Sequence, residues 1–199
     1  MRRVMYTNEN YPAPRPGVKG YIDRITGPEA TVPELIVQFV PPVVAAITTP
    51  IYAFNLAVQW TPLQLGLIAL MGFDLVGGVI TNATSSAKRW FHRPGQAWQQ
   101  QITFVSLHLT HIFLVALLLR GGDWAFFFGV SGYLLSASLL ILGSPLYLQR
   151  PVAFGLYGFA LFGDRYLYSP TVGLEWFLPL FFLKILVSHL LREVPYRPE

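Results

Sequence analysis

Long apolar runs, separated by short polar or proline-containing stretches, fill the chain from residue 32 to residue 192. Their approximate limits are residues 32–58, 62–86, 98–119, 124–142, 151–167 and 170–192. An α-helix needs roughly 20 apolar residues to cross the hydrocarbon core of a membrane, and several of these runs reach that length. The pattern therefore predicts an all-α fold: a polytopic integral membrane helical bundle with about six transmembrane helices.

Two of the runs depart from a plain apolar helix. The first contains Pro41, Pro42 and Pro50. Because proline cannot donate a backbone hydrogen bond, we expect kinks or a half-unwound stretch there. The fifth run, 151–167, is short and rich in glycine, so both a tilted helix and a re-entrant segment are compatible with it, and the sequence leaves open whether it crosses fully.

Residues 1–31 are polar and hold several prolines and glycines, without the apolar stretch of a cleavable signal peptide. We interpret them as an extended Pro/Gly-rich arm. The chain is thus divided into a cytoplasmic N-terminal arm (1–31), a six-helix transmembrane domain (32–192) and a short cytoplasmic tail (193–199).

Composition agrees with a membrane protein. Hydrophobic residues make up 53% of the chain and charged residues 12%, about half the charged share of a soluble domain. The chain has no cysteine, which excludes disulfides and cysteine-ligated metal sites. The net charge of +4 comes without a basic stripe or a nucleic-acid-binding motif, so nucleic acid is not expected as a partner.

The distribution of lysine and arginine gives an orientation, because these residues collect on the cytoplasmic side of membrane proteins. If the chain starts inside and crosses six times, eleven of them flank the inner ends of the helices. Only Arg120 and Arg165 flank the outer ends, and Lys184 lies within the last run. We therefore predict that both termini are cytoplasmic.

One face of the second run is polar. At 100° per residue, the residues on this face are Asp74, Gly77, Gly78, Thr81, Asn82, Ser85 and Lys88. We expect the face to run without a break to Lys88 and to meet other helices or a cavity, since lipid cannot satisfy these groups. The glycines and hydroxyls also suit close helix packing, whereas a buried Asp74 needs a partner or a task.

Other polar residues lie at the level of Asp74. At about 1.5 Å per residue, Asp74, His108 and Lys184 lie roughly 16–20 Å from the outer ends of their helices. His111 follows His108 by one turn on the same face. The sequence therefore predicts a buried polar cluster of Asp74, His108, His111 and Lys184 near the membrane midplane.

A second polar group, the cytoplasmic-face cluster, lies near the inner ends of the helices. It consists of Asn82, Lys88, Arg89, His92, Arg93 and His189. Its basic members are expected to bind anionic lipid head groups of the bilayer. Because the histidines occupy different depths and zinc takes three or four ligands, we predict no metal site, and no cofactor is indicated.

Two further expectations concern helix faces. An α-helical last run places Glu175, Phe182 and His189 on one face and Lys184 on the opposite one. The fourth run carries small residues at helical spacing, the small-residue seam, which favours tight packing inside the bundle or against another protein. The seam consists of Ala125, Gly129, Gly132, Ser136 and Gly143.

Three functions are compatible with these features. We favour an embedded or accessory component of a larger membrane assembly, in which a protein partner or a second copy docks on the arm and the small-residue seam. The second is a small proton-coupled or solute transporter that uses Asp74, His108 and Lys184. The third is a membrane enzyme that acts on a lipid or isoprenoid head group at the cytoplasmic-face cluster. No nucleotide loop or nucleophile motif supports catalysis, so enzymatic activity stays open.

The charge distribution generates a test of the topology. Because the chain has no native cysteine, single cysteines report their side of the membrane without background. Cysteines at Thr31 and Gln96 should be shielded from membrane-impermeant thiol reagents added outside, whereas cysteines at Gly121 and Ser169 should react. External labelling at Gln96 would reject the predicted topology.

Overall fold

The structure is a computed structural model that describes residues 11–193; predictions for residues 1–10 and 194–199 lie outside the described residues. It is 75% helix and the described residues contain no strand, which confirms the all-helical prediction. The elements are α1 (Val18–Thr26), α2 (Val32–Phe54), α3 (Pro62–Ala83), α4 (Ser85–Phe91), α5 (Trp98–Leu107), α6 (Leu109–Leu114), the π-helix η1 (Val115–Leu119), α7 (Trp124–Gly143), α8 (Leu146–Leu167), α9 (Phe177–Phe182) and the π-helix η2 (Leu183–His189).

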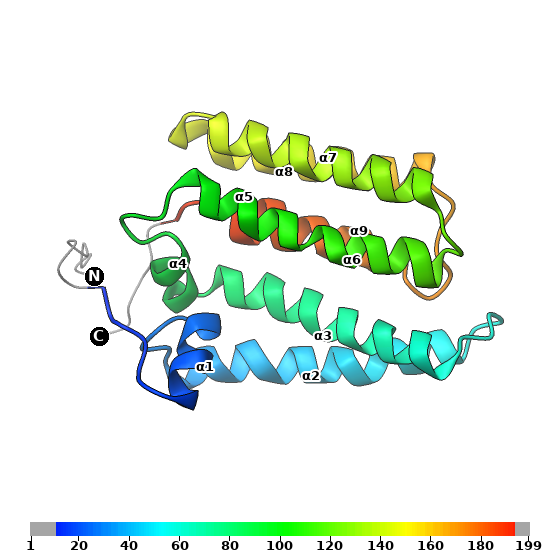
Figure 1. The fold of residues 1–199 in the computed structure, drawn as a ribbon, viewed down its shortest axis with the longest axis horizontal. Coiled ribbons are helices and arrows are strands. Elements are labelled where there is room, and N and C mark those ends of the chain that lie inside the picture. The colour runs from blue at the N-terminus through cyan, green and yellow to red at the C-terminus, as the bar shows by residue number, and fades with distance from the viewer. Residues whose placement is uncertain (1–10, 194–199) are drawn as a thin grey trace.

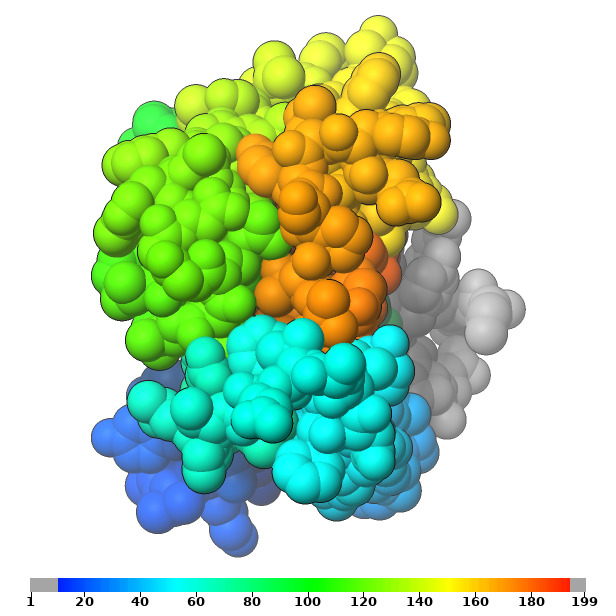
Figure 2. Space-filling model, turned by 90° about the vertical axis from the view of Figure 1, so that its right-hand side faces the viewer, coloured from blue at the N-terminus to red at the C-terminus, as the bar shows by residue number. Residues whose placement is uncertain are grey.

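The long helices run antiparallel between two ends of an elongated bundle (Figure 1). Helices α2 and α3 pack together on one side and α7 and α8 on the other, with α5–α6 and α9–η2 between them. Helices α1 and α4 lie at one end, called here the α1 end. The loops between the long helices at the other end form the far end. Figure 2 faces the far end, where the segment 168–176 lies between the loops 55–61 and 120–123.

Among the described residues, four helices are long and apolar enough to cross a membrane: Val32–Phe54, Pro62–Ala83, Trp98–Leu119 and Trp124–Gly143. Their limits agree with the predicted runs within a few residues. The last helix, Phe177–His189, is about 20 Å long at 1.5 Å per residue, which is short of the ~30 Å core. The count of about six crossings therefore stays a prediction.

Helix α2 continues through all three of its internal prolines, so the prediction of a half-unwound stretch is wrong. The helix packs almost entirely on α3, where glycines make room for it. A Cβ at Gly77 would lie 3.2 Å from the ring of Pro42, and a Cβ at Gly72 would collide with Thr49. Close packing on a glycine-containing face thus keeps the helix intact against its low propensity.

Helix α8 also differs from expectation. It begins at Leu146 after Pro145 and continues for 22 residues to Leu167, so it is a continuous helix longer than the predicted run, although it is not among the four helices apolar enough to cross a membrane. Pro151 lies in its second turn, near the helix start where a missing N–H is best tolerated. Buried Ala153 and Ala160 pack its inner face against the bundle, and the glycines face open space.

The small-residue seam lies on the outer face of α7. All five of its residues are exposed, and the buried face is formed instead by larger residues such as Phe126, Val130 and Leu134. The expectation that the seam packs inside the bundle is therefore wrong, because bulky side chains fill this core more completely than glycine. Of the three glycines in the seam, a Cβ would meet a described neighbour at Gly129, where Tyr168 lies, and would face open space at Gly132 and Gly143.

In its described part, residues 11–31, the N-terminal arm contains helix α1 and is not extended as predicted. Arg15 binds Asp23 through both its backbone N–H and its guanidinium, at 2.6–3.2 Å. This ion pair lowers the pKa of Asp23. The helix ends at Gly27, which has φ +84° and lies against the backbone of Ser86 in α4. The close approach of Gly27 to Ser86, which is distant in sequence, places this part of the arm on the bundle.

Gly27 and Gly17 allow a matched test of this docking. Both have positive φ, which costs an alanine about 1–2 kcal/mol, but only a Cβ at Gly27 would meet the Ser86 backbone. Gly27→Ala should therefore lower the unfolding free energy by about 1–3 kcal/mol more than Gly17→Ala, as expected for overpacking. Thermal unfolding in detergent measures the difference, and equal losses would contradict the docked position of α1.

Candidate functional site

The centre of the bundle holds a charged cluster built from three helices. Lys184 Nζ of η2 lies 2.5 Å from Asp74 Oδ2 of α3, and His111 Nε2 of α6 lies 2.8 Å from the same oxygen. The Lys184 side chain is 3% exposed and that of Asp74 is 36% exposed. One carboxylate therefore binds a buried ammonium and an imidazole, and its remaining surface is open.

His108 extends the cluster along α5–α6. Its ring stacks on that of His111, with centroids 5.0 Å apart and planes 12° from parallel. His108 Nδ1 lies 2.7 Å from the carbonyl oxygen of Phe104, so Nδ1 carries a hydrogen and Nε2 is left as the acceptor of the neutral ring. The four predicted members of the buried polar cluster are thus brought together.

The position of Lys184 depends on two features of the backbone. Its aliphatic chain lies against Gly78, where a Cβ would collide with it. It also lies in the π-helix η2, whose wider turn changes the direction of successive side chains. Lys184 and His189 therefore both face α3, whereas Phe182 packs on Tyr133 of α7 at 5.5 Å. The sequence predicted that Phe182 and His189 share one helix face and that Lys184 lies on the opposite one. This prediction is wrong, because it assumed that side chains follow one another at the spacing of an α-helix.

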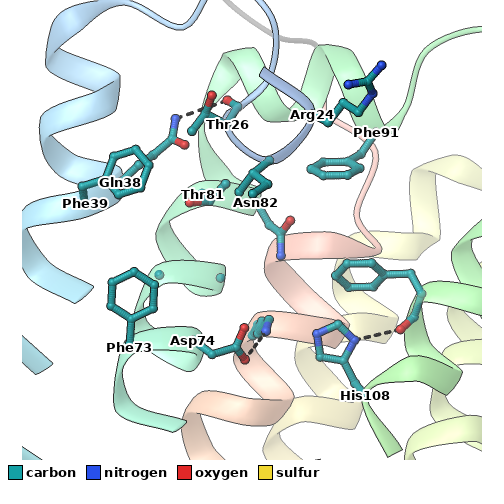
Figure 3. A pocket seen from close by; sticks show the side chains of 15 residues that line it. Arg24, Thr26, Gln38, Phe39, Phe73, Asp74, Thr81, Asn82, Phe91 and His108 are labelled. Atoms are coloured by element: carbon teal, nitrogen blue, oxygen red, sulfur yellow. Dashed lines mark hydrogen bonds and ion pairs between the residues drawn. The ribbon is translucent and has the colours of Figure 1, made fainter. Parts of the chain in front are cut away.

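A cavity of about 300 Å³ lies beside the cluster, and its walls are mostly apolar. It extends from the last turn of α1 to the ionic cluster, between α3 and α5 (Figure 3). Its lining residues include Phe39, Phe73, Phe91 and Phe104 as apolar walls. Asp74, His108 and Lys184 all contribute to its surface, so a molecule inside it would meet both charges.

A second polar region lines the same cavity nearer α1. Gln38, Thr81 and Asn82 belong to it (Figure 3). Gln38 Nε2 donates to the Thr26 carbonyl, while its Oε1 is buried without a hydrogen-bond partner in the described structure. Gln38 was not among the predicted site residues, although a lone amide within an apolar run is a signal for a buried polar contact.

The cytoplasmic-face cluster does not form an exposed basic patch. Lys88 and Arg89 are each only 4% exposed. Lys88 Nζ donates to the carbonyl oxygens of Ser188 and Leu191 at 2.7 and 2.6 Å, and burial lowers its pKa to about 8. The Lys88 ammonium thus caps the C-terminal end of the last helix, and binding of anionic lipid head groups by this cluster stays a prediction.

The other members of this cluster are also engaged internally. His92 Nε2 lies 2.8 Å from the His189 carbonyl oxygen, and burial lowers the pKa of His92 to about 4. His189 Nδ1 lies 3.4 Å from Asn82 Oδ1. Arg93 lies over the ring of Trp90 at 3.7 Å and donates to the Trp90 carbonyl. The cluster therefore fixes the end of the last helix.

The polar face of α3 does not run unbroken to Lys88, contrary to prediction. Helix α3 ends at Ala83, and Thr84 adopts an extended conformation with ψ 150°. The Thr84 hydroxyl accepts from Ala87 N–H and so caps a new helix, α4. A threonine hydroxyl that accepts a hydrogen bond from a backbone N–H in this way stabilises the start of a new helix instead of the continuation of the preceding one. The break turns Lys88 toward the end of η2.

Asp74, His108 and His111 also offer ligand atoms within 4.8 Å of one another, a spacing that a metal ion could use. The prediction of no metal site considered only histidines as ligands, whereas the Asp74 carboxylate supplies a third ligand atom. However, the Lys184 ammonium already lies on Asp74 at 2.5 Å, and a divalent cation there would be repelled by it. The residues fit an internal ammonium better than a metal ion.

No protein family, curated protein or solved structure matches this chain. The interpretation of the site therefore depends on its own geometry and charge.

The buried His92 gives a test by pH. Its pKa is lowered from 6.5 to about 4, so between these values the unfolded chain binds more protons and the folded state loses stability as the pH falls. The loss amounts to at most about 3 kcal/mol. His92→Gln keeps a donor for the His189 carbonyl and removes this titration. The melting temperature of the variant should match that of the parent protein near pH 7 and fall less steeply toward pH 4. If the melting temperatures of the two proteins fall in parallel as the pH is lowered, His92 does not cause the loss of stability.

Proposed function

We propose that the protein is a multi-pass membrane carrier that moves a small anionic, partly apolar molecule together with a proton. It crosses the membrane six times with both termini cytoplasmic, and the α1 end is the inner end. The observation that carries the proposal is the ionic cluster of Asp74, His111 and Lys184 at the end of a mostly apolar cavity. A mostly apolar pocket with a few convergent polar groups is typical of ligand sites.

The antiparallel arrangement supports six crossings. The described chain begins and ends at the α1 end, and successive long helices alternate in direction (Figure 1). The last helix is short, but it is mostly buried by its neighbours and so needs little contact with lipid. The far end carries Arg120 and Arg165, whereas most other described basic residues lie at the α1 end, which agrees with the positive-inside rule.

The chemistry of the cluster suggests how an anion and a proton are coupled. The Lys184 ammonium is neutralised by Asp74. An anion that enters the cavity and binds Lys184 neutralises the ammonium in place of Asp74. The Asp74 carboxylate then lies beside the anion without a counter-charge. Protonation of Asp74 removes the repulsion, and the His111 Nε2 contact of 2.8 Å provides a group that can transfer the proton. The loaded site has the same net charge as the empty one.

Other hypotheses receive less support from the geometry. The enzyme hypothesis required the cytoplasmic-face cluster as a substrate site, and Lys88 and His92 bind backbone carbonyls instead. The assembly hypothesis is supported by the exposed small-residue seam, and it is our second candidate function. Activity of the purified protein distinguishes the two candidates. A carrier transports its substrate without other proteins, whereas an accessory component requires its partner.

Transport by the purified chain tests the proposal. Proteoliposomes that contain a pH-sensitive dye receive an inward gradient of octanesulfonate, an amphipathic anion that does not cross membranes as a neutral acid. The parent protein should acidify the lumen. Lys184→Gln should reduce uptake by roughly tenfold or more, the effect of losing about 1.4 kcal/mol of anion binding. Asp74→Asn should separate anion uptake from acidification.

Asp164→Asn serves as the matched control, because Asp164 lies in α8 outside the cluster. It should transport like the parent protein. Variants are compared only if they elute as monodisperse protein in detergent. Unchanged coupled transport in both Lys184→Gln and Asp74→Asn would reject the carrier mechanism, and no transport by the parent chain would favour the assembly component.

A further inference from the structure

Helix α1 has its apolar side chains on the outside. Val18, Tyr21, Ile22 and Ile25 recur at the spacing of one helix face, and they are 78%, 70%, 40% and 62% exposed. On a helix that packs on a protein core in water, such a face would point inward. The apolar face of α1 therefore calls for an apolar environment beyond the described chain.

The orientation of α1 is fixed by polar contacts on its inner face. Gly20, Asp23 and Thr26 are the buried residues of the helix. Asp23 is held by Arg15, and the Thr26 carbonyl accepts hydrogen bonds from Ser86 Oγ at 2.7 Å and Gln38 Nε2 at 3.3 Å. These contacts join α1 to α2 and α4. The outward direction of the apolar face is thus set by the fold.

Two observations identify what covers this face. First, α1 lies beside the beginning of α2 (Figure 1), and α2 is a candidate membrane span in which Val32 and Ile36 are 69% and 54% exposed. Second, the exposed Lys19 and Arg24 flank the apolar stripe on its two sides at 100° per residue. Basic residues beside an apolar stripe, with a tyrosine in it, suit the head-group region of a bilayer.

We propose that α1 is an interfacial helix that lies on the inner membrane surface with Val18, Tyr21 and Ile25 inserted among lipids. Because Arg24, Ile25 and Thr26 line the cavity, this helix places the cavity entrance at the level of the lipid head groups. The inference rests on the membrane insertion proposed above and not on the carrier mechanism. It gives amphipathic molecules a route into the cavity from the membrane surface.

Site-directed spin labelling tests the position of α1 in the full-length chain. Single cysteines replace Tyr21 or Ile25, both exposed, and Lys19→Cys is the matched control beside the apolar stripe. The labelled proteins are reconstituted into phosphatidylcholine vesicles with or without phosphatidylglycerol. Labels at 21 and 25 should collide several-fold less with a water-soluble nickel chelate, and several-fold more with oxygen, than the label at 19. Flotation of the vesicles reports membrane insertion separately.

Two outcomes would overturn the inference while insertion itself is confirmed. Equal collision rates with the nickel chelate at all three positions would show that the face of α1 lies in water. Dipolar broadening at position 25 that disappears on dilution with unlabelled protein would show that a second copy covers the face. Transport variants at Lys184 should leave the collision rates unchanged, which separates this test from that of the proposed function.

Discussion

A charged pair in an otherwise apolar bundle, Lys184 with Asp74, sets the arrangement of the helices around it. A buried ammonium without a partner is strongly unfavourable, and removal of one member of such a pair typically costs about 3–5 kcal/mol. The pair can form only if the last helix approaches α3 closely, which Gly78 permits, and if its turn directs Lys184 to that side, as the π-helix η2 does. His111 adds a second hydrogen bond to the same carboxylate oxygen. Backbone geometry, a glycine and a histidine thus serve one electrostatic requirement.

The same helix is held at its C-terminal end by a second set of polar contacts. The carbonyl oxygens of Ser188, His189 and Leu191 bind Lys88 and His92, both from the segment that follows α3. Helix α3 and its continuation therefore hold the last helix at its middle and at its end. Since unpaired carbonyls in an apolar environment are costly, this explains why the Lys88 ammonium is buried.

These contacts leave a cavity beside the ionic cluster. The last helix packs against α3, α7 and α8, and the cavity remains between α3 and α5, with the Asp74 carboxylate partly open to it. At the α1 end, Thr26 connects α1 to Gln38 and Ser86, so the arm forms part of the cavity wall. The ionic cluster, the amide group at Gln38 and the apolar walls are consequently parts of a single site, which α1 lines at one end.

The sequence by itself determined the helical class, the limits of four membrane-length helices and the need of Asp74 for a basic partner. These follow from local properties: apolar length, capping residues such as Thr31 and Thr61, and the energetic cost of a buried charge. Only the tertiary structure decided the phase of the last helix, the break at Thr84 and the internal role of Lys88. Lys88 and its carbonyl partners are separated by 100 residues or more, and the Lys184–Asp74 pair by 110. Which groups satisfy one another across such distances depends on how the helices pack, and no local pattern contains that information.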